Sequence, residues 1–203
     1  MIQVIDRSNA HRHKGVLRSY GALRHEVFIR RLGWRIPCGE DGVEQDQFDG
    51  PDAVYLTVSN RSDEVVGGVR LLNMAGRSLL REVFPHLVDG AIPASPTVLE
   101  LTRFAVDHRR DRLSGCGDVS AELLWGLQEY GLWSGITQFV SVSSLGLEPL
   151  LRRAGYRFRR MGTPALSGGA MVTALKHEVS LDICHMTSRR LKPGDSGVGQ
   201  IIE

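Results

Sequence analysis

Hydrophobic and polar residues follow one another along the chain with two different spacings, and these spacings predict its helices and strands. Near the start of the chain, Val16, Tyr20, Leu23 and Val27 recur every three or four positions. That spacing is typical of one face of an amphipathic helix. We therefore expect a helix over residues 11–32.

Short apolar runs, bounded by Gly, Asn, Asp and Pro, predict the strands. They cover residues 2–5, 53–59, 65–72, 98–106, 139–142 and 171–179. Helical patterns predict three further helices at 79–88, 119–133 and 147–153. Early hairpin strands followed by a strand-helix-strand crossover are typical of an α/β fold, a three-layer mixed sheet flanked by helices.

Two segments carry polar residues that mark them as candidate site segments. The strand at 98–106 contains Glu100, Thr102 and Arg103. Strand alternation predicts Glu100 and Thr102 on one face and Arg103 on the other. Residues 33–51 are rich in Gly, Asp, Glu and Pro and predict a long ordered loop. Loops of that length in compact domains are usually functional or disordered.

Length and composition limit the class of protein. With 203 residues, we expect one domain over 1–203, with a loosely held tail from about residue 192. The content of hydrophobic and charged residues is ordinary for a soluble protein, and no apolar run approaches the roughly 18 residues of a membrane span. The first residues lack the pattern of a secretion signal, so we expect a cytoplasmic protein. The three cysteines and seven histidines form no disulfide or metal motif.

Charge is nearly balanced overall but uneven along the chain. The net charge of +2 is too small to indicate nucleic acid as a partner. Basic residues gather in three clusters at 109–112, 152–160 and 189–192. Each cluster is either a solvated face or a docking surface for an acidic partner. A non-catalytic basic binding module, which recognises an acidic protein or nucleic acid, is one alternative function for the chain. Against it, the clusters lack interleaved aromatic residues.

One spaced pattern of residues extends over the first half of the chain. It begins Leu23-Arg24-x-x-x-Phe28-x-x-Arg31-x-x-Trp34, continues with Asp46-x-x-Asp49 and Arg70, and ends in Glu100-Leu101-Thr102-Arg103. In this order and at these spacings, the residues resemble the acyl-homoserine-lactone synthases, the bacterial enzymes that make quorum-sensing autoinducers. The second half of the chain resembles that family only in its general layout.

The resemblance implies an acyltransferase that joins two substrates. S-adenosylmethionine supplies the amine that attacks an acyl thioester, and its carboxylate then closes on the γ-carbon with release of methylthioadenosine. S-adenosylmethionine is therefore a substrate, and no cofactor is implied. The resemblance also implies the fold that these synthases share with acyl-CoA N-acyltransferases. The rival function is an acyl-CoA-dependent N-acyltransferase that acts on another amine.

Glu100 is the candidate general base. Removing a proton from the substrate ammonium requires an acceptor, which acts directly or through water. Partial burial beside Leu99 and Leu101 would raise the pKa of the carboxyl group. The alternative is a structural ion pair with Arg103 or Arg70, which the residues alone favour and the resemblance does not.

The other residues of the pattern are candidates for binding S-adenosylmethionine. The guanidinium forks of Arg24 and Arg103 suit a substrate carboxylate; the alternative is a surface salt bridge, for Arg24 with its sequence neighbours Glu26 and Asp41. Acidic side chains could hold the arginines, receive the substrate ammonium or form a solvated loop. Aromatic side chains attract a cation, or pack in the core. The candidates on this side are Arg24, Phe28, Trp34, Asp46, Asp49, Arg70, Phe84 and Arg103.

The candidates for the acyl pocket are Thr102, Val142 and Ser143. Thr102 stands where the family usually has serine, a change that keeps the hydroxyl group. On the later strand, many family members that favour 3-oxo chains carry threonine where this chain reads Ser141-Val142-Ser143-Ser144. Ser143 can donate a hydrogen bond to a 3-substituent, but chain length and substitution stay open.

Two segments are candidates for binding the acyl donor. Arg112-x-x-Gly115-x-Gly117 matches the pyrophosphate loop of the N-acyltransferases, in which backbone N–H groups hold a phosphate, or is an ordinary loop. The second basic cluster could instead dock an acidic acyl carrier protein. Five arginines in nine residues, and the habit of the family, favour the carrier protein over CoA. These arginines are Arg152, Arg153, Arg157, Arg159 and Arg160.

Overall fold

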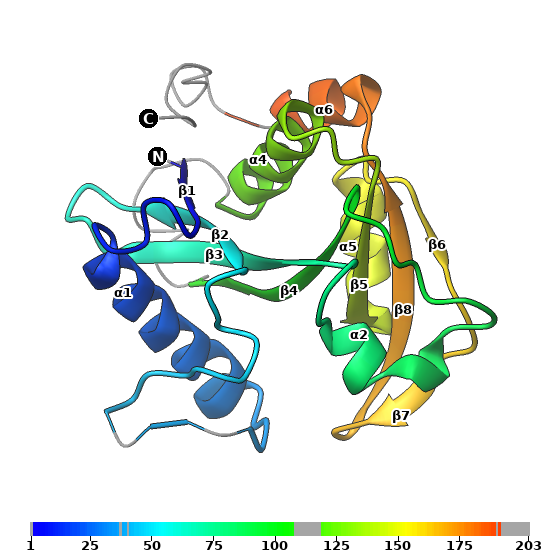
Figure 1. Ribbon diagram of the computed structural model, residues 1–203, viewed down its shortest axis with the longest axis horizontal. Helices are drawn as coiled ribbons and strands as arrows, with labels where there is room; N and C mark the ends of the chain where they lie inside the picture. The colour runs from blue at the N-terminus through cyan, green and yellow to red at the C-terminus, as the bar shows by residue number, and fades with distance from the viewer. Residues whose placement is uncertain (1, 37, 40, 108–118, 190, 192–203) are drawn as a thin grey trace.

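The structure, a computed structural model, describes residues 2–36, 38–39, 41–107, 119–189 and 191. In this part of the chain, eight strands form one sheet (Figure 1). They are β1 (Ile2–Ile5), β2 (Val54–Ser59), β3 (Val65–Asn73), β4 (Val98–Val106), β5 (Gln138–Ser144), β6 (Phe158–Arg160), β7 (Ala165–Ser167) and β8 (Ala170–Glu178). All the predicted strands are confirmed, whereas β6 and β7 were not predicted.

The predicted helices are confirmed with changes at their ends. The α-helices are α1 (Lys14–Arg24), α2 (Leu79–Glu82), α4 (Val119–Trp133), α5 (Glu148–Arg153) and α6 (Leu181–Ser188). A π-helical segment, η1 (His25–Arg31), continues α1. Two 3-10 turns, η2 and η3, cover Pro85–Leu87 and Leu145–Leu147. Among the described residues, no helix has both the length and the apolar character that crossing a membrane requires.

The sheet is mixed, as the sequence predicted. Its strands lie in the order β1-β2-β3-β4-β5-β8-β6, with β7 paired to β8. Neighbouring strands are antiparallel except β4 and β5, which are parallel. Parallel neighbours require a crossover connection, and α4 lies in the connection between β4 and β5.

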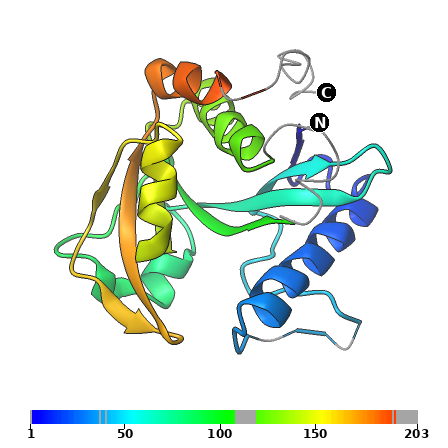
Figure 2. The ribbon, with the colours of Figure 1, turned by 180° about the vertical axis from the view of Figure 1, so that it is seen from behind.

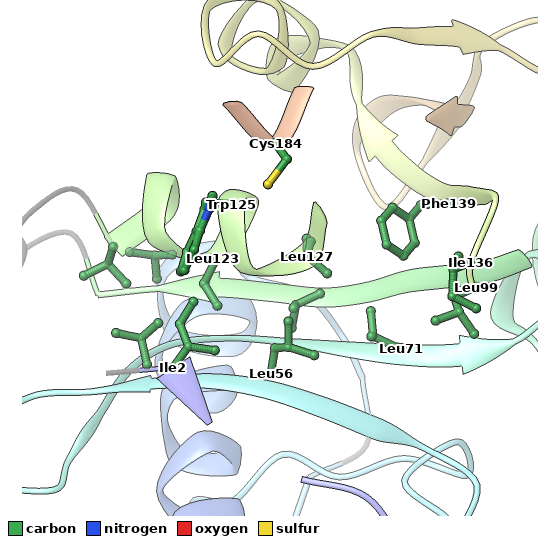
Figure 3. Packing of buried hydrophobic residues seen from close by; sticks show 14 of the residues in the cluster. Ile2, Leu56, Leu71, Leu99, Leu123, Trp125, Leu127, Ile136, Phe139 and Cys184 are labelled. Carbon is green, nitrogen blue, oxygen red and sulfur yellow. The ribbon is translucent and has the colours of Figure 1, made fainter. Parts of the chain in front are cut away.

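Helices cover both faces of the sheet, which confirms the three-layer α/β architecture. In Figures 1 and 2, α1 lies on one face of the half formed by β2, β3 and β4, and α4 lies on the other. Figure 3 shows Leu123 and Leu127 of α4 packed toward Leu56 and Leu71 of the sheet. All four side chains are almost fully buried. This core supports β3 and β4 from the face that carries α4. The candidate site lies on the other face, which carries α1.

A β-bulge in β4 changes the direction of one predicted site residue. Thr102 pairs with Arg70 and Ala105 pairs with Gly68, so two residues of β4 oppose one residue of β3. Arg103 adopts a left-handed φ of 54° at this point, which is uncommon for a residue other than glycine. Its side chain lies on the same face of β4 as Thr102. The predicted alternation, with Arg103 on the other face, is therefore wrong, because a bulge interrupts the strand period.

Candidate active site

Three arginines and three carboxylates form a closed ring on the sheet face that carries α1. The arginines come from α1, β3 and β4, and all three carboxylates come from the loop at 33–51. Each carboxylate contacts two arginines, so positive and negative charges alternate around the ring and balance. In order, the members of this charge ring are Arg24, Glu44, Arg103, Asp46, Arg70 and Asp49.

Asp49 and Asp46 each bind one arginine through both oxygens. Nη1 and Nη2 of Arg24 donate to Asp49 at 2.7 and 2.9 Å. The same atoms of Arg70 donate to Asp46 at 2.6 and 3.0 Å. Each carboxylate also reaches a second arginine, since Asp49 lies 2.9 Å from Nη1 of Arg70. Asp46 accepts from Nη2 of Arg103 at 2.7 Å. Bidentate contacts of this kind are strong, charge-assisted hydrogen bonds.

Glu44 closes the charge ring, and it is the member that the sequence pattern did not select. Its Oε2 accepts a hydrogen bond from Nε of Arg24. Its two oxygens accept from Nε of Arg103 at 3.2 and 3.3 Å. The only signal in the sequence was the position of Glu44, two residues before Asp46 in the acidic loop.

The ion pairs considered for Arg24 from its neighbours in sequence are wrong. Asp41 pairs with Arg18 at 3.1 Å. Glu26 lies 3.7 Å from an arginine one helical turn later. Arg24 instead reaches carboxylates 20 and 25 positions further along the chain.

Burial and pairing together set the charge state of the ring. Burial alone would raise the pKa of Asp49, but the hydrogen bond and charge of Arg24, with the charge of Arg70, hold that pKa below its ordinary value. Burial opposes the charged form of Arg24, but its bonds to Asp49 and Glu44 keep its pKa above the ordinary value. Arg24 and Asp49 are therefore both charged at neutral pH. Breaking a buried pair of this kind typically costs about 3–5 kcal/mol.

Arg103 has a guanidinium nitrogen that finds no acceptor in the described part of the chain. All three nitrogens of Arg24 donate within the charge ring. Those of Arg70 donate to Asp46 and, from Nε at 3.0 Å, to Oγ1 of Thr102. Nε and Nη2 of Arg103 are occupied, whereas its Nη1 is not. Arg103 can therefore bind one further anionic group.

A stacked pair of aromatic rings lies beside Arg103. Phe28 of η1 and Trp34 stack with ring centroids 4.7 Å apart and ring planes at 21°. The guanidinium carbon of Arg103 lies 5.7 Å from the centroid of Phe28. Phe28 is buried, whereas Trp34 is 41% exposed. Short π-helical segments such as η1 are rare and frequently occur at functional sites.

Glu100 lies on the same face of β4 as the charge ring and is fully buried. Its two carboxylate oxygens accept the backbone N–H groups of Leu79 and Leu80 at 2.7 and 2.8 Å. Burial raises the pKa of Glu100 to about 7, although these hydrogen bonds and the charge of Arg70 act in the opposite direction. Glu100 forms no ion pair with Arg70, Arg103 or any other described arginine, unlike the structural alternative considered from the sequence. A carboxyl group with a pKa near 7 is suited to general acid–base catalysis.

An apolar cluster adjoins Glu100. Leu80, whose N–H group binds the carboxylate, belongs to it, and so does Val140, the partner of Glu100 on β5. Phe84 and Val142 pack against this cluster rather than against the charge ring. Its buried members are Met74, Leu80, Leu87, Val98, Val140 and Ala174.

Ser143 does not join the other candidates. Successive residues of a strand point to opposite faces, so Ser143 faces away from the side on which Val142 packs. Its hydroxyl lies 3.1 Å from that of Ser141, which in turn lies 2.9 Å from Nε2 of His177. Burial lowers the pKa of His177 to about 4, so this imidazole is neutral at pH 7.

The five arginines of the second basic cluster are all exposed, but three of them have partners within the chain. Arg160 donates to both oxygens of Glu148 at 2.7 and 3.1 Å. Arg157 lies 3.6 Å from an acidic side chain of β8, and Arg152 lies 4.5 Å from the centroid of a phenylalanine ring. In the described part of the chain, two have no such partner: Arg153 and Arg159.

Two further predictions concern bound groups. The candidate phosphate loop at Arg112, Gly115 and Gly117 lies outside the described residues. Within the described residues, no group of three or more His, Cys, Asp or Glu side chains is arranged to hold a metal ion.

The arrangement of the sheet and helices is shared with enzymes that transfer acyl groups to amines. The structure of an acyl-CoA N-acyltransferase from Pseudomonas aeruginosa matches with a TM-score of 0.55, covering 87% of this chain and 97% of that chain. The sequence identity is 16%, so the likeness concerns the fold alone. The predicted fold class is confirmed.

More similar proteins define the family. Residues 8–184 match the family model described as autoinducer synthase. An acyl-homoserine-lactone synthase from Acinetobacter baumannii is 36% identical over 162 residues, covering 77% of this chain and 88% of the relative. A structure of BjaI, described as a CoA-dependent acyl-homoserine lactone synthase with SAM and isopentyl-CoA, matches with a TM-score of 0.86 and 31% identity, covering 94% of this chain and 88% of that chain. This chain belongs to the autoinducer synthase family, and the predicted acyltransferase class is confirmed.

Proposed function

We propose that the chain is an acyl-homoserine-lactone synthase that acts on S-adenosylmethionine and an acyl thioester. The observation that carries this proposal is the placement of three features on one face of β3 and β4. They are a charge ring in which Nη1 of Arg103 has no described acceptor, an aromatic stack with Trp34 at the surface, and a buried carboxyl group beside an apolar cluster. Together they match the anionic, cationic and apolar parts of the two substrates.

Arg103 is the proposed ligand of the S-adenosylmethionine carboxylate. Its Nη1 has no acceptor among the described residues, and a guanidinium binds a carboxylate through strong, charge-assisted hydrogen bonds. Trp34, stacked on Phe28, offers an aromatic face to the adenine or the sulfonium group. Arg24 and Arg70, each of whose guanidinium nitrogens already donates a hydrogen bond within the site, hold the loop in place instead of binding substrate. This proposal keeps one arginine, Arg103, of the two-arginine clamp expected from the sequence.

Glu100 is the proposed base for the acylation step. Each carboxylate oxygen has two lone pairs and accepts one backbone N–H group, so one lone pair of each oxygen is left for a proton. Glu100 takes a proton from the substrate ammonium, directly or through water, and the free amine attacks the thioester carbonyl. The carbon–sulfur bond breaks, the nitrogen loses a second proton, and the departing thiolate takes up a proton in its place, so that protons balance in this step. An amide and a free thiol result.

Ring closure follows within the acylated product. Its carboxylate attacks the γ-carbon next to the sulfonium, the carbon–sulfur bond breaks, and neutral methylthioadenosine leaves with the electron pair. This step needs a folded conformation of the substrate more than a catalytic group, because the sulfonium is already a good electrophile. Arg103 would orient the attacking carboxylate.

The acyl chain is proposed to enter the apolar cluster beside Glu100, with Val142 and Phe84 at its border. Thr102 accepts a hydrogen bond from Arg70 and donates one to the backbone oxygen of the same residue. Its hydroxyl therefore supports the charge ring rather than the acyl chain. Ser143 points to the other face of β5 and is left out of this pocket.

Acyl carrier protein is the first candidate donor, with Arg153 and Arg159 as its docking residues. No described acidic side chain pairs with either arginine, whereas Arg160 is paired with Glu148. Acyl-CoA is the second candidate, favoured by the similarity to BjaI, which is described as CoA-dependent.

The function is tested by incubating the purified protein with S-adenosylmethionine and a panel of acyl thioesters. We expect acyl-homoserine lactone and methylthioadenosine, detected by mass spectrometry. Acylation of another amine with S-adenosylmethionine left intact would instead support the rival N-acyltransferase.

The donor is tested with the same acyl group on the carrier protein and on CoA. Arg153→Glu/Arg159→Glu should lower kcat/KM for the carrier-borne substrate by about tenfold, and rising salt should lower it further in wild type. Arg61→Glu, an exposed arginine in the turn between β2 and β3, is the matched control. Equal use of the CoA thioester, with no effect of the double variant, would assign the donor to CoA.

A further inference from the structure

Glu44 is the one member of the charge ring, among the described residues, that pairs with both Arg24 and Arg103. Its carboxylate is fully buried and is the only acceptor, among the described residues, for Nε of Arg103. The same carboxylate accepts from Nε of Arg24. Glu44 thus joins Arg103 of β4 to Arg24 of α1.

The backbone of Glu44 is fixed as firmly as its side chain. Its N–H group donates to the carbonyl oxygen of Gly21 in α1 at 3.0 Å. The loop approaches α1 so closely here that a Cβ atom on Gly21 would lie 2.5 Å from Cγ1 of Val43. This fixed backbone limits where the Glu44 carboxylate can lie, and so limits where it can hold the Arg103 guanidinium.

Such an anchor matters for Arg103, because this residue interrupts the regular alternation of its strand. It lies in the β-bulge with a left-handed φ of 54°, a conformation that persists only where the surroundings enforce it. Asp46 contacts Arg103 only through Nη2. This single contact would leave the guanidinium free to turn. Glu44 binds Nε as well and stops this rotation.

We propose that Glu44 is a positioning residue for the carboxylate of S-adenosylmethionine, acting through Arg103. It holds the guanidinium so that Nη1 stays open beside Phe28 and Trp34, and it completes the balance of three positive and three negative charges in the ring. The inference rests on the proposed function for the identity of the ligand. It assigns Glu44 to the binding of the amino-acid part of that ligand and not to the binding of its adenosine part.

Methylthioadenosine provides the test, because it keeps the adenosine part and lacks the carboxylate. Glu44→Gln keeps the size of the side chain and removes its charge. We expect the Kd of S-adenosylmethionine, measured by calorimetry, to rise about tenfold or more, as for the loss of one charge-assisted contact. The Kd of methylthioadenosine should stay within about twofold of wild type. In turnover assays, KM for S-adenosylmethionine should rise while KM for the acyl thioester does not.

Two further variants keep the test decisive. Glu44→Asp retains the charge but is one methylene shorter, so it cannot span both arginines; we expect the same selective loss even if Glu44→Gln folds poorly. Leu127→Ala, in the core on the opposite face of the sheet, is the destabilised control and should leave the ratio of the two Kd values unchanged.

Two results would overturn the inference. One is an equal loss of affinity for both ligands in Glu44→Asp, which would make Glu44 a structural residue only. The other is unchanged affinity for S-adenosylmethionine in both Glu44 variants. Failure of the proposed function would look different, since wild type would then bind neither ligand or form no lactone.

Discussion

Replacing Glu100 by glutamine tests the site through both stability and catalysis. The carboxylate accepts two backbone N–H groups, from Leu79 and Leu80. An amide offers only one oxygen, so one of these buried donors loses its acceptor. Such a loss typically costs about 1–3 kcal/mol. We expect Glu100→Gln to be folded but less stable than wild type at low pH.

The difference in stability should depend on pH, with a sign that follows from the raised pKa. Burial raises the pKa of Glu100 to about 7 in the folded state, from an ordinary value of 4.5. The stability that Glu100 contributes is therefore fully present below about pH 4.5 and is lost as the pH rises through 7. The total loss is on the order of 3 kcal/mol. Glutamine does not titrate. The difference in free energy of unfolding between wild type and variant should therefore shrink by about this amount as the pH rises.

Urea unfolding of both proteins at pH 5, 6, 7 and 8 measures this difference. A difference in free energy of unfolding that stays constant, or widens with pH, would show that the charged carboxylate is not destabilised by burial.

Turnover provides the second measurement. Loss of a correctly placed base lowers the rate by about a hundredfold or more. A variant that keeps wild-type turnover would leave Glu100 as a support for α2 only.

Three further changes test separate parts of the site. Arg103→Ala should weaken S-adenosylmethionine by about tenfold or more and spare methylthioadenosine, because only the former has a carboxylate; calorimetry showing equal losses would place the carboxylate elsewhere. Trp34→Ala should weaken both ligands, since both carry adenine, and unchanged binding of methylthioadenosine would exclude the aromatic stack as their platform. Val142→Phe should lower kcat/KM for long acyl chains more than for short ones, because it fills the apolar cluster; an unchanged chain-length profile would exclude this cluster as the acyl site.

The sequence predicted most of the sheet and the main helices because their residues follow a regular period. The helix α1 shows that period clearly, whereas the three-residue strands β6 and β7 are too short to show any. The π-helical continuation of α1 was not predictable either, since one extra residue per turn leaves little trace in seven residues. The bulge at Arg103 depends on the pairing of β4 with β3, which a single strand does not encode.

The candidate site was predictable where its residues follow a family pattern and not where they depend on contacts between distant segments. The pattern selected Asp46 and Asp49 but not Glu44, although all three lie in one loop and close the same ring. The contacts of Glu44 with Arg103 span 59 positions in sequence. Ser143 was selected by its hydroxyl group, but the face of β5 on which it lies depends on the register of the sheet.

Isotope-labelled S-adenosylmethionine gives the most direct test of the proposed activity. With ¹⁵N in the α-amine, we expect the label in the amide of the lactone and one methylthioadenosine released per lactone formed. Both steps would then occur on one molecule of substrate, as the open donor of Arg103 and the buried carboxyl group of Glu100 require. Acyl transfer without release of methylthioadenosine, or an acylated product that lacks the label, would contradict this function.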